Sequence, residues 1–398
     1  MSRVLISVPP LTGHVNPTVG LGAELSARGH QVAWTGLPGV VDVLLPPGAD
    51  FIPLVGALDQ QQFDQMQRRG TGLRGPEALK FLWEDFIIPY AVATAPELSA
   101  VVEAFDPHVL VADQQAVAGP VVARQQDVPW VTSATTSAEL TDPLADLPKV
   151  DAWVRAQLVD LQVQLGVDPE TAATGDLRFS DQLVIAFTTR ALLGPVAVPA
   201  STLRFVGPSI ARRPDATPFP WEWLDPQRRH VLVTLGTVNA QIGTRFFAAA
   251  IDALAGTDVQ AVIVAPSDEI PIPPGVTNIL VRPRIPQLAV LEHMDAVVTH
   301  GGHNTVCESL DRGLPLVLAP IRDDQPIVAD QVVRAGAGVR VRFGRVGADE
   351  LRAAITGVLE EPSYRIAADV IRRSFRDAGG ASAAADAVDD LLLAKEPA

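Results

Sequence analysis

The chain has 398 residues, which is too long for one ordinary hydrophobic core, so we expect two domains of roughly 200 residues each. Apolar residues make up 47% of the sequence, a share that excludes a disordered chain. Lys and Arg number 31 against 46 Asp and Glu, giving a net charge of −15. So acidic a surface repels phosphate backbones and anionic lipid, and argues against nucleic-acid and membrane partners.

The first residues give no sign of export. The apolar run in "MSRVLISVPPLTGH" is short and ends at Pro9 and Pro10, whereas a secretory signal needs a longer run and a cleavage site. No stretch approaches the ~20 apolar residues of a membrane span. Cys307 is the only cysteine, which excludes an internal disulfide and a thiolate metal cluster. We expect a cytoplasmic monomer or homodimer.

The N-terminal half begins with a strand, a helix and a second strand. Residues 3–8 have the length and β-branching of a buried strand, residues 16–30 have helical periodicity with a stop at Gly29, and residues 31–36 form the next strand. This spacing is a βαβ unit, which implies a parallel sheet. The βαβ pattern continues with segments at residues 108–113, 121–126, 129–134 and 182–187.

A proline-rich segment interrupts the pattern at residues 206–227, with the composition of a semi-rigid linker. Strands then resume at 230–237, 259–265, 278–282, 296–300 and 314–320. Helices are predicted at 245–256, 304–313 and 326–336, and an Ala-rich last helix at 380–395.

The sequence therefore predicts an α/β protein with two doubly wound, Rossmann-like domains. The expected divisions are an N-terminal domain at 1–208, a linker at 209–227, a C-terminal domain at 228–380, and a C-terminal helix at 381–398 that packs back towards the N-terminal domain.

The segment "THGGHNTVCESL" (299–310) joins a predicted buried strand to a predicted helix. Three other polar segments also follow strands of the same domain: "TLGT" (234–237), "RPRIPQ" (282–287) and "RDDQ" (322–325). Because the carboxyl ends of parallel strands share one edge of a sheet, these segments should converge on one crevice. A helix that starts there presents backbone N–H groups and a positive dipole end, which suit an anion.

These residues carry a resemblance. The stretch from Arg284 to Gln325 resembles the nucleotide-sugar signature of family 1 glycosyltransferases with the GT-B fold, above all the bacterial enzymes that glycosylate macrolides and other natural products. The segment "LTGHVNPTVGLGAELSARGHQVAW" (11–34) is similar to the N-terminal part of the same family. The resemblance implies two domains that face each other across a cleft, and an inverting transfer that uses a nucleotide sugar with no metal and no further cofactor.

For the donor, the resemblance implies that His300 contacts the diphosphate, that Asn304 and Thr305 hold phosphate oxygens, and that Thr237 adds a hydroxyl. Glu308 would bind the ribose, and Asp324 and Gln325 would bind the transferred sugar. The full set of implied donor residues is Thr237, Arg284, Ile285, Gln287, His300, Gly302, Asn304, Thr305, Glu308, Asp324 and Gln325. Read without the resemblance, Thr237 is a turn residue and Glu308 a solvated carboxylate.

Arg284 departs from the family, which commonly has a Trp there that stacks on uracil. A guanidinium also stacks on a base but specifies it less, so TDP is as plausible a donor nucleotide as UDP. The adjacent Asp323 and Asp324 could suggest a metal pair, but a third ligand at suitable spacing is lacking.

His14 follows the first strand and is the candidate general base, because a neutral imidazole there can take a proton from an acceptor hydroxyl. The family pairs this base with an Asp after a later strand, and Asp113 occupies that place. Taken alone, His14 could be a core or capping residue, and Asp113 a helix cap.

The acceptor pocket is sought in residues 63–90, where Phe81, Trp83 and Phe86 follow a Gly-rich stretch and could line an aromatic wall. Aromatic residues at this spacing more often belong to a hydrophobic core than to a pocket.

The sequence thus predicts transfer of a hexose or deoxyhexose from a UDP- or TDP-sugar to a hydroxyl of a small natural product, such as a polyketide, macrolide or aromatic aglycone. Two alternatives stay open: a sugar-nucleotide epimerase on the same fold, and a catalytically silent nucleotide-sugar-binding partner of another transferase.

Overall fold

A computed structural model describes residues 1–56, 58, 60–70, 72–210, 217–236, 243–266 and 270–395. The chain folds into two units. Unit 1 comprises Met1–Thr189, Pro195–Arg213 and Ala378–Ala398, and unit 2 comprises Arg190–Gly194 and Pro214–Asp377. The short segment Arg190–Gly194, which we expected in the N-terminal domain, therefore belongs to unit 2.

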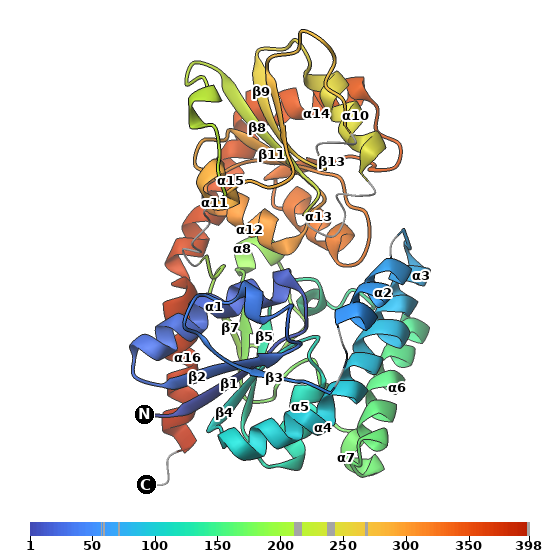
Figure 1. Cartoon of the computed structure of the whole chain (residues 1–398), viewed down its shortest axis with the longest axis vertical. Coiled ribbons are helices and arrows are strands. Elements are labelled where there is room, and N and C mark those ends of the chain that lie inside the picture. Colours follow the sequence, from blue (N-terminus) through green and yellow to red (C-terminus); the bar gives the residue numbers. More distant parts are fainter. Residues whose placement is uncertain are drawn as a thin grey trace. The chain divides into compact units, whose positions relative to one another are not determined.

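In the part of the chain that the structure describes, unit 1 holds a seven-stranded parallel sheet in the order β3-β2-β1-β4-β5-β6-β7 (Figure 1). The strand bounds are β1 Arg3–Ser7, β2 Gln31–Gly36, β3 Asp50–Pro53, β4 Val109–Asp113, β5 Trp130–Ala134, β6 Val184–Ala186 and β7 Leu203–Phe205. Strand order reverses between β1 and β4, and this switch point is where open α/β sheets bind their ligands.

Unit 2 repeats the design with a six-stranded parallel sheet, as far as it is described, in the order β10-β9-β8-β11-β12-β13. Its strands are β8 Arg229–Thr234, β9 Val259–Val264, β10 Ile279–Arg282, β11 Ala296–Thr299, β12 Leu316–Leu318 and β13 Gly338–Arg340. The switch point here lies between β8 and β11, directly before the histidine-rich segment.

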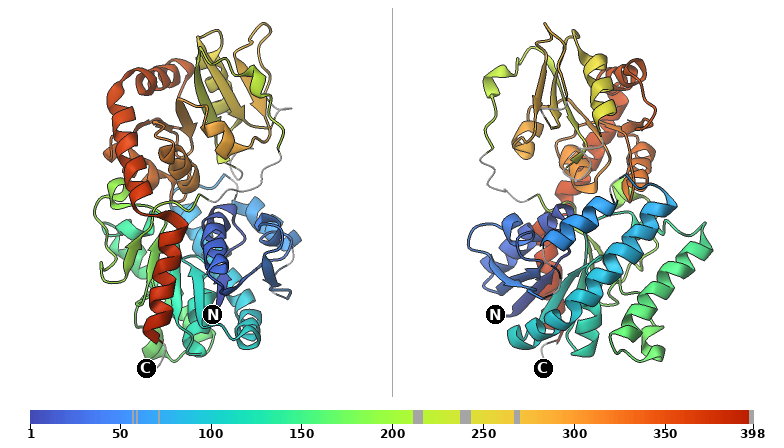
Figure 2. Two further views of the ribbon diagram at one scale, coloured as in Figure 1. Left: turned by 90° about the vertical axis from the view of Figure 1, so that its left-hand side faces the viewer. Right: turned by 45° about the vertical axis from the view of Figure 1, so that its right-hand side comes forward.

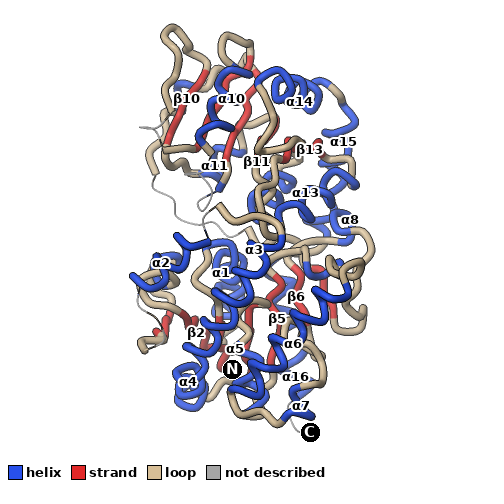
Figure 3. Tube along the Cα trace, turned by 90° about the vertical axis from the view of Figure 1, so that its right-hand side faces the viewer, coloured by secondary structure: helices blue, strands red, loops and turns tan. Residues whose placement is uncertain are grey.

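Helices lie over the strands in both units (Figure 3). In unit 1 these are α1 Thr12–Ala27, α2 Gln60–Gly70, α3 Pro76–Lys80, the π-helical η2 Phe81–Ile87, α4 Ile88–Phe105, α5 Ala118–Gln125, α6 Pro148–Gln164, α7 Pro169–Ala172 and α16 Gly380–Lys395. In unit 2 they are α8 Arg190–Leu193, α10 Thr244–Leu254, α11 Gln287–Leu291, α12 His303–Asp311, α13 Gln325–Arg334, α14 Ala348–Glu360 and α15 Pro362–Asp377. Single 3-10 turns are η1 Asp42–Leu44, η3 Glu139–Thr141 and η4 Trp221–Trp223.

Two apolar clusters cover the two faces of the unit 1 sheet. On one face, alternate residues of β1 such as Val4 and Ile6 pack with α1 and α16. On the other face, Leu5 and Leu110 pack with α4, α5 and α6. This alternation follows from the twofold period of a strand, and it buries both faces of a parallel sheet.

The C-terminal helix α16 lies beside α1 (Figure 2). Nη1 of Arg28 donates to Asp386 and Asp389 at 2.7 and 2.8 Å, and His30 Nε2 lies 2.8 Å from Asp389. Through these polar contacts and the buried Ala384 and Val388, the end of the chain completes the core of unit 1.

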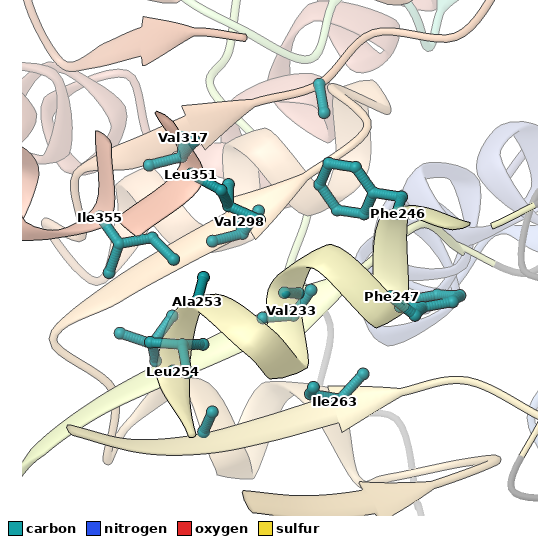
Figure 4. Packing of buried hydrophobic residues seen from close by; sticks show 14 of the residues in the cluster. Val233, Phe246, Phe247, Ala253, Leu254, Ile263, Val298, Val317, Leu351 and Ile355 are labelled. Carbon is teal, nitrogen blue, oxygen red and sulfur yellow. The ribbon is translucent and has the colours of Figure 1, made fainter. Parts of the chain in front are cut away.

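The core of unit 2 is built around α10 and α14 (Figure 4). Phe246 and Phe247 of α10 are almost fully buried against Val233 of β8 and Val298 of β11. Close packing of this face fixes the strands, and thereby the loops that leave their carboxyl ends.

One expectation about a helix was wrong. Helix α1 begins at Thr12, not at residue 16, so His14 lies in the first helical turn. In residues 63–90, where we expected a Gly-rich loop and an aromatic wall, α2 ends at Gly70, residues 72–75 form neither helix nor strand, and a continuous helical run through α3, η2 and α4 begins at Pro76. The expected Gly-rich loop is therefore present, with positive φ at Gly72 and Gly75, and the aromatic residues follow it in a helical run.

Among the described residues, the run Pro76–Phe105 is long and apolar enough to cross a membrane by length and composition, which we had not expected. Its apolar residues Ala91, Ala95 and Leu98 are buried against the sheet of unit 1. A helix in the core of a folded protein can be as long and apolar as a membrane span, and this packing accounts for the composition of the run.

Candidate functional site

His14 lies at the carboxyl edge of the unit 1 sheet, where the chain leaves β1 and enters α1. Its place in the first turn of α1 gives it a regular backbone, and its side chain is only 14% exposed. The nearest carboxylate comes from the neighbouring strand: Asp113 is the last residue of β4, and its side chain is fully buried.

The structure brings these two predicted residues together, although 99 positions separate them. His14 Nδ1 lies 2.9 Å from Asp113 Oδ1, which also accepts the backbone N–H of Gln115 at 2.8 Å. An ionised carboxylate offers only acceptors, so the proton of the neutral imidazole belongs on Nδ1. The Nε2 atom is then the basic nitrogen, as a general base requires.

Thr135, which the sequence analysis missed, completes this group of side chains. Its Oγ1 lies 2.6 Å from Asp113 Oδ2 and 2.9 Å from His14 Nδ1. Thr135 directly follows β5, and a hydroxyl residue at the end of a strand is too common to be singled out without the position of its neighbours.

A second set of buried charges lies in the same unit. Arg178 donates to Asp176 at 2.7 Å, and its Nη1 is 3.7 Å from Oε2 of Glu139, a residue of η3. Burial raises the pKa of Glu139 to about 7, against the opposing effect of Arg178, and the charge of Asp113 contributes to the rise. Glu139 therefore changes its charge near neutral pH.

In unit 2, His300 directly follows β11, and two glycines enclose its ring. A Cβ atom on Gly236 would lie 2.7 Å from His300 Cε1, and one on Gly302 would lie 2.6 Å from Nε2. Burial lowers the pKa of His300 to about 4, and Arg322 contributes to the decrease. The imidazole is therefore neutral at physiological pH and can donate one N–H to a ligand without carrying charge.

The helix α12 begins at His303, three residues after His300. Gly302 is its N-cap and contributes no side-chain hydrogen bond to the first turn. Asn304 and Thr305 occupy that turn, where backbone N–H groups and the helix dipole favour an anion. The predicted phosphate-binding residues His300, Gly302, Asn304 and Thr305 thus lie directly before α12 or in its first turn.

Gln287 and Glu308, both predicted for the donor, are in direct contact. Gln287 Nε2 donates to Glu308 Oε2 at 2.6 Å, which joins the start of α11 to the middle of α12. Glu308 is nearly buried at 6% exposure, so it is not the solvated carboxylate of the alternative interpretation. A carboxylate held in this way retains acceptor capacity for ligand hydroxyls.

The segment after β12 contains Asp324 and Gln325. Gln325 Oε1 accepts the backbone N–H groups of Ile321 and Arg322 at 3.0 and 3.2 Å, so its carbonyl fixes the loop. Asp324 is the N-cap of α13, and Asp323 before it has a left-handed backbone with φ of 56°. If Gln325 binds a sugar hydroxyl, it therefore does so through its amide nitrogen.

Three other residues were predicted to bind the donor: Arg284, Ile285 and Thr237. Arg284 is exposed in the loop after β10, and Ile285 beside it is buried. Thr237 lies outside the described residues, so its role stays a prediction.

The three aromatic residues proposed for the acceptor lie against the core of unit 1. Trp83 and Phe86 are buried, Phe81 is partly buried, and the Phe86 ring stacks on Tyr90 with centroids 6.2 Å apart. This is the core packing that the sequence left open, and lining an acceptor pocket stays a prediction for these residues.

Within the part of the chain that is described, no group of three or more His, Cys, Asp or Glu side chains is placed to hold a metal ion. Burial raises the pKa of the Cys307 thiol, so this residue carries no thiolate near neutral pH.

Comparisons with known proteins agree with this geometry. Residues 210–377 match the family described as UDP-glucoronosyl and UDP-glucosyl transferase. The chain is 31% identical to 4'-demethylrebeccamycin synthase of Lentzea aerocolonigenes, with 98% of each chain covered. It is 28% identical to demethyllactenocin mycarosyltransferase of Streptomyces fradiae, over 98% of this chain and 87% of the relative.

The crystal structure of the glycotransferase of kitacinnamycin superposes with a TM-score of 0.78 at 27% identity, covering 98% of this chain and 99% of that one. Two parallel-sheet α/β units with these switch-point residues define a GT-B glycosyltransferase of the natural-product type. The chain belongs to the UDP-glucoronosyl and UDP-glucosyl transferase family.

Proposed function

We propose that this glycosyltransferase moves a hexose or deoxyhexose from a UDP- or TDP-sugar to a hydroxyl of a small natural product, with inversion at the anomeric carbon. The acceptor class is a polyketide, macrolide or aromatic aglycone. The names of the two relatives, a rebeccamycin-type synthase and a mycarosyltransferase, support a natural-product acceptor.

The contact between His14 and Asp113 is the observation that carries the proposal. An alcohol is a poor nucleophile at neutral pH, because its proton must leave as the new C–O bond forms. His14 Nε2 takes this proton, and Asp113, 2.9 Å from Nδ1, stabilises the imidazolium that results. The acceptor oxygen attacks the anomeric carbon on the side opposite to the diphosphate, which leaves with the electron pair of the broken bond.

The departing diphosphate needs stabilisation of its developing charge. In our proposal the first turn of α12 and the neutral N–H of His300 provide it, and Glu308 with Gln287 holds the ribose. Neutral donors and a helix terminus can do this without a metal. Addition of EDTA or Mg²⁺ should therefore leave the rate of transfer unchanged, and a strict metal requirement would refute this part of the mechanism.

The deciding experiment compares the parent enzyme with His14→Ala. UDP- and TDP-glucose are mixed with a panel of flavonoids and macrolides, and the products are identified by mass. We expect a glycoside from the parent, a loss of about 10²–10⁴-fold in transfer to an alcohol for His14→Ala, and unchanged binding of the nucleotide diphosphate. Transfer to a nitrophenol or thiophenol, whose proton is already largely lost, should suffer less.

The same assay separates the alternatives. An epimerase would return an altered sugar nucleotide without a glycoside, and a silent binding partner would return neither product. If His14→Ala glycosylates alcohols at the parent rate, the base lies elsewhere and the mechanism fails.

A further inference from the structure

The hydroxyl of Thr135 touches both members of the His14–Asp113 pair. Thr135 is 2% exposed, and its position follows from the sheet: Asp113 of β4 is in register with Ser133 of β5, two residues before Thr135. Parallel pairing of β4 with β5 therefore delivers the Thr135 side chain to the carboxyl group of Asp113.

The donors and acceptors of this group fit together in one way. The Thr135 hydroxyl donates to Asp113 Oδ2 at 2.6 Å, which leaves its oxygen lone pairs facing His14 Nδ1 at 2.9 Å. The Nδ1 proton then lies between two acceptors, Thr135 Oγ1 and Asp113 Oδ1. If Nδ1 were bare instead, it would face the lone pairs of Asp113 Oδ1 with no proton between them.

We propose that Thr135 is a positioning residue that fixes the rotation of the Asp113 carboxylate and thereby the tautomer and orientation of His14. This role rests on the function proposed above, in which Nε2 of His14 is the base. In this role Thr135 acts through Asp113 and through Nδ1 of His14, the ring nitrogen that is not the proposed base.

Removal of the hydroxyl alone should have a specific effect. In Thr135→Val the shape of the side chain is kept, but Oδ2 of the fully buried Asp113 carboxylate loses the hydroxyl that donates to it, and Nδ1 loses one of two acceptors. The carboxylate can then rotate or recruit water, and the imidazole is held less firmly. Because small misplacements of a catalytic group are costly, we expect transfer to an alcohol to fall roughly 10–100-fold.

The experiment uses the full chain with ¹⁵N-labelled histidine. The seven histidine signals are recorded by NMR, and the His14→Gln spectrum identifies that of His14. Nitrogen shifts report which ring nitrogen bears the proton, without any substrate. Thr135→Val and Thr135→Ser are compared with Thr188→Val, a matched control in the same unit: Thr188 is 1% exposed, and its Oγ1 makes no hydrogen bond with any described residue.

We expect His14 in the parent to be protonated on Nδ1 alone, Thr135→Val to show mixed protonation with slower transfer, and both Thr135→Ser and Thr188→Val to resemble the parent. The inference is overturned if Thr135→Val keeps the parent spectrum, whatever its rate, or if Thr135→Ser fails to restore spectrum and rate. An altered spectrum in Thr135→Val together with full activity of His14→Ala would reject the proposed base while leaving the positioning role intact.

Discussion

Gly236 and His300 are in contact across two loops of unit 2, and the space between them has no room for a methyl group: a Cβ on Gly236 would come within 2.7 Å of Cε1 and 3.0 Å of Nε2. Gly236 also has a φ of 71°, a conformation that residues with a side chain rarely adopt. Gly236 thus limits where the His300 imidazole can lie.

Gly236→Ala should therefore displace His300 and weaken the binding of UDP and TDP by about 10-fold or more, as measured by calorimetry. Gly256→Ala is the matched control, because Gly256 has a similar φ of 68° but nothing within 4 Å of its Cβ position. Equal nucleotide affinities in the two variants would mean that the enclosure of His300 is irrelevant to donor binding.

His300 should stay neutral far below the usual histidine range. Burial lowers its pKa from 6.5 to about 4, so its NMR signal should not titrate until the solution approaches pH 4. Between pH 6.5 and about pH 4, the histidine binds its proton more readily in the unfolded chain than in the folded one. The contribution of His300 to stability is therefore lost as the pH falls through about 4. A midpoint near 6.5 would show that the ring is solvated and charged in acid.

The contribution of Glu139 to stability depends on pH in the opposite direction. Burial raises its pKa from 4.5 to about 7, so the folded state holds the proton more tightly, and the corresponding stability is lost as the pH rises through about 7. Glu139→Gln should raise the free energy of unfolding by about 1–3 kcal/mol at about pH 8 and change it little at about pH 5.

Urea unfolding at the two pH values measures this difference. Glu103→Gln, which alters an exposed carboxylate on α4, supplies the control and should be neutral at both. A stability gain for Glu139→Gln that is independent of pH would show that the carboxyl does not titrate in this range.

Asp324→Ala should spare the affinity for the bare nucleotide diphosphate while it lowers turnover and alters the ranking among donor sugars, if this residue reads the sugar hydroxyls. Asp323→Asn tests the neighbouring carboxylate, and Asn tolerates the left-handed backbone at that position, where φ is 56°. We expect Asp323→Asn to retain the parent ranking. A parent-like donor profile for Asp324→Ala, measured with a panel of UDP- and TDP-sugars, would remove the assignment.

Short patterns in the sequence were enough to predict much of this site. Hydrophobic periodicity located β1, β8 and β11, and glycines and histidines next to a strand end pointed to the loop at His300. The Ala-rich end became α16 with the expected bounds of 380–395. These features depend on neighbours within a few residues, which is the range over which a sequence pattern carries information.

The sequence by itself determined that His14 and Asp113 would stand at carboxyl ends of strands, and that the residues predicted to bind phosphate would lie at the start of a helix. Only the tertiary structure decided that β5 lies next to β4, which brings Thr135 to Asp113, and that the loop after β8 places Gly236 against His300. It also buried Trp83, Phe86 and Leu98 in a helical run that packs against the sheet, whereas Gly72 and Gly75 lie in the loop before that run. Such contacts join segments 22 or more positions apart, as Thr135 and Asp113 are, and the order of strands in the sheet sets them.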